Sequence, residues 1–345
     1  PNNLAQKLSR EGFHIFGTQA ENIDRAEDRN AFSALLDKLS ILQPKWSSFT
    51  SMNEAKKFAQ VEGFPVLVRP SYVLSGAAMR VCYDEGQLSS FITKAAVLSP
   101  EYPVTISKYI ENNKPYVIEV NLRASRTFPM LSKAMDVNFP EMAVDSFFGK
   151  AVKHKFVYPK YVVVKSPQFS FSRLLGADPV LRVEMSSTGE AACFGKDYDE
   201  ALLKSVLSTN RFDFEKKTVL LSLGGDINKA KFIETAHILH SLGYKLFATD
   251  TTAEFLNHHK VHCQSVRKAH EVSPNVLDII EGKKVSFVVN LSKDGSMDGV
   301  SKRSATQITD GFRIRRATVD NQIPLFTDLH LARAFIKALA HHKIE

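Results

Sequence analysis

The spacing of apolar residues predicts a mixture of helices and short strands in the first part of the chain. Residues 22–39 carry apolar side chains three or four positions apart, behind a good N-cap at their first position, which is typical of a helix. Similar spacing predicts helices over 53–61, 87–98 and 198–207. β-rich runs predict strands over residues 64–68, 79–83, 103–110, 116–121 and 161–164. The first two strands form a hairpin-like pair around a loop of small residues.

The pattern changes near residue 210, and strands alternate with helices from there onward. Strands are predicted over 218–223, 245–248 and 286–290. Helices are predicted between and after them, over residues 228–242, 252–258, 274–282 and 329–341. This alternation predicts a parallel sheet wrapped by helices. We therefore expect an α/β fold throughout, ending in a doubly wound domain over 213–345.

Length and composition indicate a globular protein of more than one domain. The 345 residues exceed what one hydrophobic core usually holds, and 44% of them are hydrophobic and 24% charged. No apolar run approaches the roughly 20 residues that a membrane-spanning helix needs, so no membrane association is expected. The chain opens with Pro1 in place of an initiator Met, and we interpret it as an internal part of a longer protein.

Charge and cysteine content narrow the possible ligands. There are 45 basic and 37 acidic residues, a net charge of +8, without a nucleic-acid-binding motif or a long basic tract. Cys82, Cys193 and Cys263 lie far apart, which argues against a disulfide framework or a zinc site. We expect a reducing compartment, no nucleic-acid partner, and ligands that are small anions.

An arginine at the end of a predicted strand is the first candidate binding group. Arg69 follows the apolar run 66–68 and precedes a loop of small residues that includes Ser75 and Gly76. Such a loop can present backbone N–H groups to phosphates, while the guanidinium donates a forked pair of hydrogen bonds. The alternative is a structural salt bridge beside an ordinary tight turn.

A second group of candidates follows the pattern Glu119-x-Asn121-x-Arg123-x-x-Arg126. In a strand, Glu119 and Asn121 would project to one face and offer two oxygen ligands to Mg²⁺. Arg123 and Arg126 would neutralise phosphoryl oxygens beside the metal. Alternating charges on an edge strand are the competing interpretation.

Polar residues also follow the predicted C-terminal strands, where a parallel sheet usually binds anionic ligands near helix N-termini. A lysine opens the first helix, a second lysine lies near residue 270, and hydroxyl and amide groups end the other strands. The dinucleotide fingerprint GxGxxG is absent, so NAD is not expected. Helix capping and strand ends are the alternative roles for these residues. The set consists of Lys229, Thr249, Thr252, Lys268, Asn290 and Ser292.

The first two groups, together with Arg25-Ala26-Glu27-Asp28-Arg29 and Ser186-Ser187-Thr188-Gly189-Glu190, resemble the second ATP-grasp unit of carbamoyl-phosphate synthases. In that family the unit transfers a phosphoryl group from MgATP to carbamate, which itself derives from bicarbonate. The resemblance implies an ATP-grasp domain over 21–208, preceded by the end of another domain over 1–20. Mg²⁺, or Mn²⁺ in its place, would be the metal.

The resemblance also implies roles for individual residues. Arg29 and Arg69 would contact the ATP phosphates, and the loop with Ser75 and Gly76 would lie over them. Glu119 and Asn121 would hold the metal. Arg123 and Arg126, with Asn121, would act on the transferring phosphoryl group, as phosphoryl transfer needs positioning and charge neutralisation. The adenine would meet the backbone of Lys108, Tyr109 and Ile110.

The chain departs from the family after Asn113. There the family continues for several dozen residues that form one wall of the nucleotide site, whereas Lys114-Pro115 follows at once here. Disordered residues missing from the sequence and a true deletion both explain the gap, and we favour disorder. We expect the chain as written to be catalytically incomplete.

The C-terminal segment resembles the methylglyoxal-synthase-like regulatory domain of the same family, and Arg313-Ile314-Arg315-Arg316-Ala317 resembles its arginine stretch, although surface charge is the alternative. The family domain binds an allosteric nucleotide, and the six C-terminal candidates match its contacts. The urea-cycle form has a tryptophan where Lys268 stands. The resemblance therefore implies UTP or UMP, or phosphoribosyl pyrophosphate, as effector, with N-acetylglutamate as the alternative.

For the whole protein, the resemblance implies glutamine-dependent synthesis of carbamoyl phosphate for pyrimidines, with a glutaminase domain or subunit as partner. Homo-oligomerisation and a cytoplasmic location are expected, with the mitochondrial matrix as the alternative location. A catalytically inactive fragment that binds a regulatory nucleotide is the competing hypothesis from another functional class.

Overall fold

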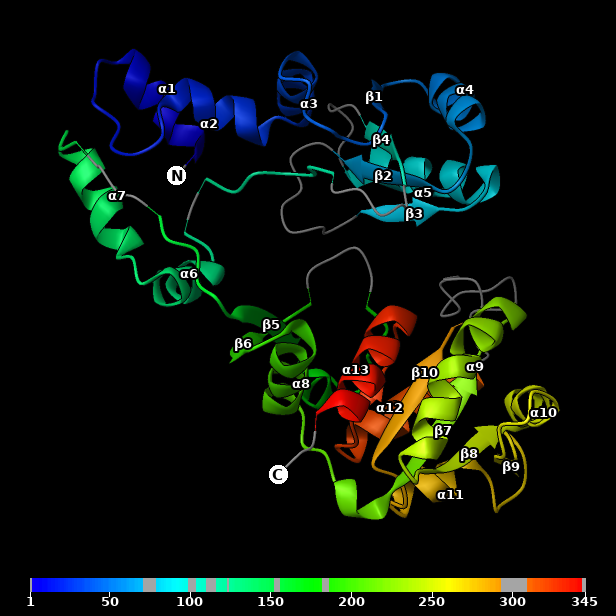
Figure 1. Cartoon of the computed structure of the whole chain (residues 1–345). Coiled ribbons are helices and arrows are strands. Elements are labelled where there is room, and N and C mark those ends of the chain that lie inside the picture. The colour runs from blue at the N-terminus through cyan, green and yellow to red at the C-terminus, as the bar shows by residue number, and fades with distance from the viewer. Residues whose placement is uncertain are drawn as a thin grey trace. The chain divides into compact units, whose positions relative to one another are not determined.

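The computed structural model describes residues 2–70, 79–98, 104–109, 116–122, 124–151, 156–181, 186–292 and 309–342 (Figure 1). The chain divides into two compact units. The N-terminal unit comprises residues 1–157 with 182–185, and the C-terminal unit comprises 158–181 with 186–345. This division into compact units does not test the predicted domain boundaries, 1–20, 21–208 and 213–345, which stay predictions.

The N-terminal unit begins with three helices, α1 (Asn2–Arg10), α2 (Ala20–Glu27) and α3 (Arg29–Lys38). The single helix predicted over 22–39 is therefore wrong. Asp28 breaks it, because its backbone is extended and its carboxylate accepts a hydrogen bond of 2.7 Å from the N–H of Ala31. An aspartate in this role starts a new helix.

A four-stranded antiparallel sheet follows, in the order β1-β4-β2-β3. Residues Val66, Val68 and Ile106 are fully buried in its core. The predicted pairing of two strands around a small-residue loop is confirmed, because β2 and β3 are antiparallel neighbours. The elements are β1 (Trp46–Phe49), α4 (Met52–Glu62), β2 (Val66–Pro70), β3 (Arg80–Cys82), α5 (Glu85–Leu98) and β4 (Val104–Lys108).

The strand predicted over 116–121 is wrong, since the described residues 116–122 form no strand. Val117 donates one backbone hydrogen bond to Leu42, and no ladder extends from it. Two helices that were not predicted come next, α6 (Thr127–Met135) and α7 (Phe139–Phe147).

The C-terminal unit starts with an antiparallel ribbon, β5 (Val162–Gln168) and β6 (Gly189–Gly195), which packs against α8 (Tyr198–Thr209). The short helices η1 (Phe171–Arg173) and η2 (Phe214–Lys216) lie in the connections. The serine hydroxyls of Ser166 and Ser205, 2.7 Å apart, link the ribbon to α8.

A five-stranded parallel sheet forms the rest of this unit, in the order β11-β10-β7-β8-β9. The predicted doubly wound parallel sheet is thereby confirmed. Its strands are β7 (Thr218–Leu223), β8 (Lys245–Thr249), β9 (Gln264–Val266), β10 (Phe287–Leu291) and β11 (Leu325–Phe326). Its helices are α9 (Asp226–Ser241), α10 (Asp250–His258), α11 (Val276–Glu281), α12 (Asp310–Asp320) and α13 (Leu329–His341).

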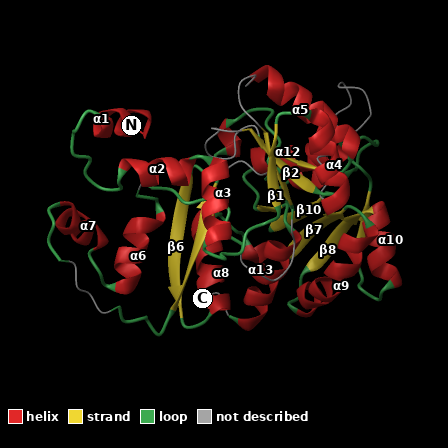
Figure 2. Cartoon of the chain, turned by 90° about the horizontal axis from the view of Figure 1, so that it is seen from above, coloured by secondary structure: helices red, strands yellow, loops and turns green. Residues whose placement is uncertain are grey.

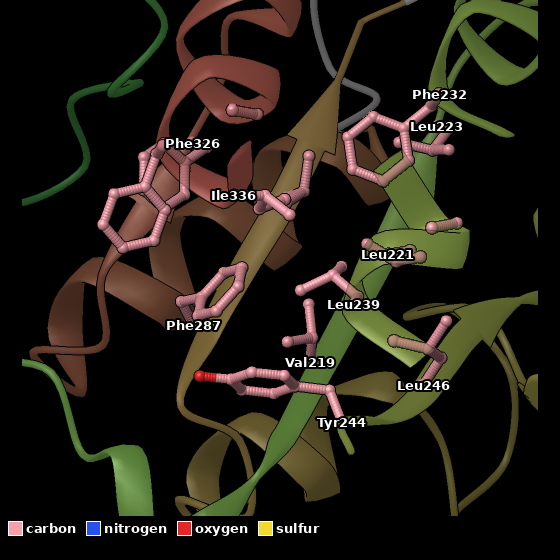
Figure 3. Packing of buried hydrophobic residues seen from close by; sticks show 14 of the residues in the cluster. Val219, Leu221, Leu223, Phe232, Leu239, Tyr244, Leu246, Phe287, Phe326 and Ile336 are labelled. Carbon is pink, nitrogen blue, oxygen red and sulfur yellow. The ribbon is translucent and has the colours of Figure 1, made fainter. Parts of the chain in front are cut away.

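Alternate residues of the central strands point to opposite faces of this sheet, as strand geometry requires. Val219, Leu221 and Phe287 pack with α9 and α13 on one face (Figure 3), and α8 adds Leu202, Leu203 and Val206 to this cluster. Leu220 and Val288 pack on the other face, with α11 and α12. The helices around the sheet can be followed from above in Figure 2.

Candidate nucleotide-binding sites

Arg69 lies near the end of β2 and is only 6% exposed. Its Nη2 donates to the Ser107 hydroxyl at 3.3 Å, and its buried Nε has no hydrogen-bond partner among the described residues. Burial, and then the charge of Arg29, lower the pKa of Arg69 to about 10, while Glu119 raises it. A buried guanidinium with a free donor is suited to an incoming anion, because leaving such a donor unpaired costs free energy.

Arg29 brings Glu119 and Asn121 to the same place. Its Nη2 lies 3.3 Å from a Glu119 carboxylate oxygen, across 90 residues of sequence. The amide of Asn121 donates to the other Glu119 oxygen at 3.3 Å. The two predicted metal ligands are thus neighbours although the strand that was to hold them is absent from the described residues.

The carboxylate of Glu119 and the amide oxygen of Asn121 fit Mg²⁺, which commonly takes one or two protein oxygen ligands together with substrate phosphates. No cluster of three or more His, Cys, Asp or Glu side chains occurs within the described ranges. A bound metal would therefore depend on phosphate oxygens for further ligands.

The remaining predicted ATP contacts are residues that the structure does not describe or whose contact with ATP stays a prediction. Ser75, Gly76, Ile110 and Arg123 lie outside the described residues. Arg126 directly precedes α6. Lys108 and Tyr109 lie at the end of β4, an inner strand. The Tyr109 N–H donates to the Pro65 carbonyl at 3.2 Å, and Lys108 Nζ donates to the Gly63 carbonyl at 2.8 Å. Their contact with adenine remains a prediction.

The predicted effector residues of the C-terminal unit include three that are already engaged within the protein. The Thr252 hydroxyl accepts from the Leu223 N–H at 3.1 Å and lies 3.3 Å from that of Thr249. Thr252 is completely buried and Thr249 is 8% exposed. Asn290 is 3% exposed, and its side-chain oxygen accepts from Arg315 at 2.8 Å.

The two lysines and Ser292 are less completely buried than these three residues. Lys229, in the first turn of α9, lies 3.2 Å from Asp226 and over the ring of Phe255. Lys268 and Ser292 are both partly exposed. The Lys268 N–H donates to a Glu271 carboxylate oxygen at 2.5 Å, and the Ser292 carbonyl oxygen accepts from the Asn228 amide at 3.0 Å. Their binding roles remain a prediction.

Sequence reasoning missed the importance of the arginines in α12. Arg315 is 3% and Arg316 9% exposed, so the alternative of plain surface charge is wrong for these two residues. Arg315 makes two hydrogen bonds of 2.7 Å to Asp178, and Arg316 pairs with Asp320. The double arginine is a signal for anion pairing, but nothing local points to a partner 137 residues away.

Two family models match the chain in this order. The carbamoyl-phosphate synthase L chain, ATP binding domain, matches residues 28–122, and the MGS-like domain matches residues 231–327. The first range includes Arg29, Arg69 and Glu119, and the second includes Lys268 and Asn290. The predicted fold class, an ATP-grasp domain followed by a methylglyoxal-synthase-like domain, is confirmed.

Whole-chain comparisons agree with the domain matches. The chain is 36% identical to multifunctional protein pyr-3 of Neurospora crassa, over 99% of this chain and 23% of that protein. It is 35% identical to multifunctional protein URA2 of Saccharomyces cerevisiae, over 99% and 19%. This chain belongs to the carbamoyl-phosphate synthase family. It is also 32% identical to the mitochondrial carbamoyl-phosphate synthase (ammonia) of Homo sapiens, over 98% and 28%.

The chain spans about a fifth to a quarter of the length of these multifunctional relatives. The alignment with pyr-3 extends over 430 residues, although this chain has 345, so the relative has several dozen residues without a counterpart here. Among solved structures, the biotin carboxylase domain of Hydrogenobacter thermophilus 2-oxoglutarate carboxylase aligns with a TM-score of 0.49 at 12% identity, over 60% of this chain and 71% of that one. No helix within the described ranges is long and apolar enough to cross a membrane.

Proposed function

We propose that this chain supplies the carbamate-phosphorylating ATP site and the effector domain of a glutamine-dependent carbamoyl-phosphate synthase of pyrimidine biosynthesis. The observation that carries the proposal is the group of Arg29, Arg69, Glu119 and Asn121, with Arg69 near the end of β2. It combines two cations with two oxygen ligands, as transfer of a phosphoryl group from MgATP requires.

In this proposal each side chain has a limited task. Arg69 binds a phosphate oxygen through its free Nε, and Arg29 transfers its contact from Glu119 to the nucleotide. Glu119 and Asn121 then hold Mg²⁺ or Mn²⁺, which neutralises charge on the transferring group. Arg123 and Arg126 contact that group, while the loop with Ser75 and Gly76 covers the phosphates.

The substitution Glu119→Gln tests the metal role in the complete parent enzyme. It removes one ligand charge and no packing volume, so ATP-dependent phosphorylation of carbamate should be abolished with an unchanged melting temperature. Glu54→Gln, on an exposed position of α4, is the matched control and should retain activity. Near-normal turnover by the Glu119 variant would refute the metal assignment.

We further propose that the 345 residues alone are catalytically incomplete. The longer alignment with the relatives supports this, because an ATP-grasp site closes its nucleotide between two lobes. Phosphorylation of carbamate by a polypeptide of only these residues would contradict the proposal.

The proposed effector is UTP or UMP, and phosphoribosyl pyrophosphate is a related polyanion. An ammonium at Lys268, with Lys229, Thr249, Thr252, Asn290 and Ser292, favours a phosphate ligand, since a positive charge neutralises it directly. Isothermal titration of the chain with UTP and with N-acetylglutamate compares the two hypotheses. Heat released only by N-acetylglutamate would favour the urea-cycle type.

The same proposal covers the remaining organisation. Residues 1–20 end a preceding domain, 21–208 form the ATP-grasp domain, and 213–345 form the effector domain. The parent binds bicarbonate and works with a glutaminase domain or subunit, as a cytoplasmic homo-oligomer. A regulatory fragment without activity would bind UTP but show no Mg²⁺-dependent ATP binding, and equilibrium binding with and without Mg²⁺ separates these cases.

A further inference from the structure

Arg315 connects two distant parts of the C-terminal unit through one buried guanidinium. Its Nε and Nη2 donate to the two oxygens of Asp178, each at 2.7 Å. Its Nη1 donates to the side-chain oxygen of Asn290 at 2.8 Å. Asn290 lies in β10, an inner strand of the parallel sheet that pairs with the central strand β7. A shift of the guanidinium would therefore change its hydrogen bonds to both Asp178 and Asn290.

Asp178 belongs to residues 169–181, here called the Asp178 segment, which follows β5. Leu174 and Leu175 of this segment are 55% and 88% exposed, so these two apolar side chains contribute little to its position. Polar contacts from α12 hold it instead. Arg316 donates to the carbonyl oxygens of Phe171, Leu174 and Ala177 at 3.0–3.1 Å. A segment held mainly by hydrogen bonds is easily released when a donor is withdrawn.

The side-chain oxygen of Asn290 cannot keep its present hydrogen bond with Arg315 and also be fully available to a ligand. Its side-chain oxygen is already the acceptor for Arg315, and the residue is 3% exposed. A nucleotide that uses this amide must rearrange the contact with Arg315. Because Arg315 grips Asp178 with the rest of its donors, the rearrangement reaches the Asp178 segment.

We propose that Arg315 is a positioning residue that couples ligand binding at Asn290 to the Asp178 segment. This inference rests on the proposed effector site. The segment runs up to Leu181, where this stretch of the C-terminal unit ends, so it lies on a covalent route between the two units. A ligand shifts such an element only as far as its contacts differ between the two arrangements, and here the difference is the Asn290–Arg315 hydrogen bond.

Hydrogen–deuterium exchange of the full chain, with and without UTP, tests the coupling. Peptides from the first turn of α9 report binding, and peptides over 171–180 report the Asp178 segment. UTP should change exchange at both places in the wild type, by about fivefold or more at the segment, the lower end of typical coupling between sites. Arg315→Lys retains the charge but loses the two-pronged contact, so the change at the segment should fall below about 1.5-fold while the change at α9 persists.

The substitution Asp320→Asn is the matched control. It weakens the grip of Arg316 on the same segment without touching Asn290, so its response to UTP should equal that of the wild type. A wild-type response confined to α9 would overturn the coupling and leave the effector site standing. An equal loss of response in Asp320→Asn and Arg315→Lys would also overturn it.

If UTP changes exchange at neither place, the effector assignment fails, and Asn290→Ala then tests the coupling without a ligand. This substitution removes the acceptor of Arg315 Nη1 and should by itself change exchange over 171–180 by about twofold or more, as expected for a lost hydrogen bond to a charged group. Unchanged exchange over these residues would overturn the inference.

Discussion

The two candidate sites differ in how far the protein already satisfies their polar groups. At the N-terminal site, the Nε of Arg69 is a buried donor without a partner among the described residues. At the C-terminal site, Thr252 and Asn290 are buried and hydrogen-bonded within the fold. A ligand at the first site would fill an existing deficit, whereas a ligand at the second would replace internal contacts.

This difference separates two kinds of function. A site with unpaired charge gains affinity directly from its ligand and can hold it for chemistry. A site whose polar groups are already paired converts binding into rearrangement, which is what regulation needs. The contrast therefore agrees with a catalytic role for the first site and a regulatory role for the second.

The largest effect is expected from breaking the C-terminal network at its centre. Arg315→Met leaves Asp178 and Asn290 without their shared donor, and Asp178 is itself only 15% exposed. Removing one partner of a buried pair typically costs about 3–5 kcal/mol. Urea denaturation of the chain should show this loss of unfolding free energy in the C-terminal unit.

Arg313→Met is the control for that measurement, because Arg313 lies on the same helix and is exposed. It should change the unfolding free energy by less than about 0.5 kcal/mol, as surface substitutions usually do. Equal stability of the two variants would show that the buried network contributes nothing.

A smaller effect is expected for effector binding. Lys268→Ala should weaken UTP binding by about 1.5–3 kcal/mol, the range for hydrogen bonds to a charged group, and added salt should reduce the difference. Isothermal titration measures both. His262 is exposed and lies close to Lys268 in the sequence. His262→Ala is therefore the control and should bind UTP like the wild type. Unaltered affinity of the Lys268 variant would remove this lysine from the site.

The N-terminal site should show the opposite balance of stability and binding. Arg69→Met removes a buried cation that has one hydrogen bond, of 3.3 Å, to the part of the chain that the structure describes, so the unfolding free energy should change by only about 0–1 kcal/mol. ATP affinity should nevertheless fall by about 1.5–3 kcal/mol. Lys57→Met, exposed on α4, should alter neither quantity. A large loss of stability at Arg69 with normal ATP binding would reverse the comparison.

The C-terminal sheet could be predicted from the sequence because its signals are local. The strand over 218–223 is mostly apolar and buried, and it is followed by a helix with its own spacing. The helix predicted over 22–39 failed at Asp28, which caps α3; aspartate favours this role but is also tolerated inside helices. Its choice depends on the packing of the two helices rather than on the local pattern.

The strand predicted around Glu119 failed for a different reason. An alternation of polar and apolar side chains indicates that a segment can form a strand. A strand also needs a neighbouring strand with free backbone N–H and C=O groups. Arg29 and Glu119 nevertheless lie 3.3 Å apart across 90 residues of sequence. The contact of Arg315 with Asp178 spans 137 residues. Such pairs follow from the topology, and no spacing within either motif predicts them.

The smallest effect on the unfolding free energy is expected at Tyr244. This residue lies in the C-terminal core and belongs to neither candidate site. Tyr244 is 3% exposed beside Phe287 (Figure 3), and its hydroxyl is buried without a partner among the described residues. Burial raises the pKa of this phenol from 10.0 to about 12. Tyr244→Phe removes an unpaired hydroxyl, so the unfolding free energy at pH 7 should stay equal or rise by up to about 1 kcal/mol.

The pH dependence of the same pair of proteins has a definite sign. A tyrosine whose folded pKa is raised stabilises the fold fully below pH 10, and this contribution is lost as pH rises towards 12, because the unfolded chain releases the proton first. The Phe variant should therefore gain on the wild type between pH 10 and 12. Cys82 and Cys263, each with a pKa raised by burial to about 11, titrate in both proteins and cancel. Denaturation at pH 7, 9.5 and 11 measures the gap, and exposed Tyr198→Phe should show none; a gap that narrows with rising pH would contradict the assignment.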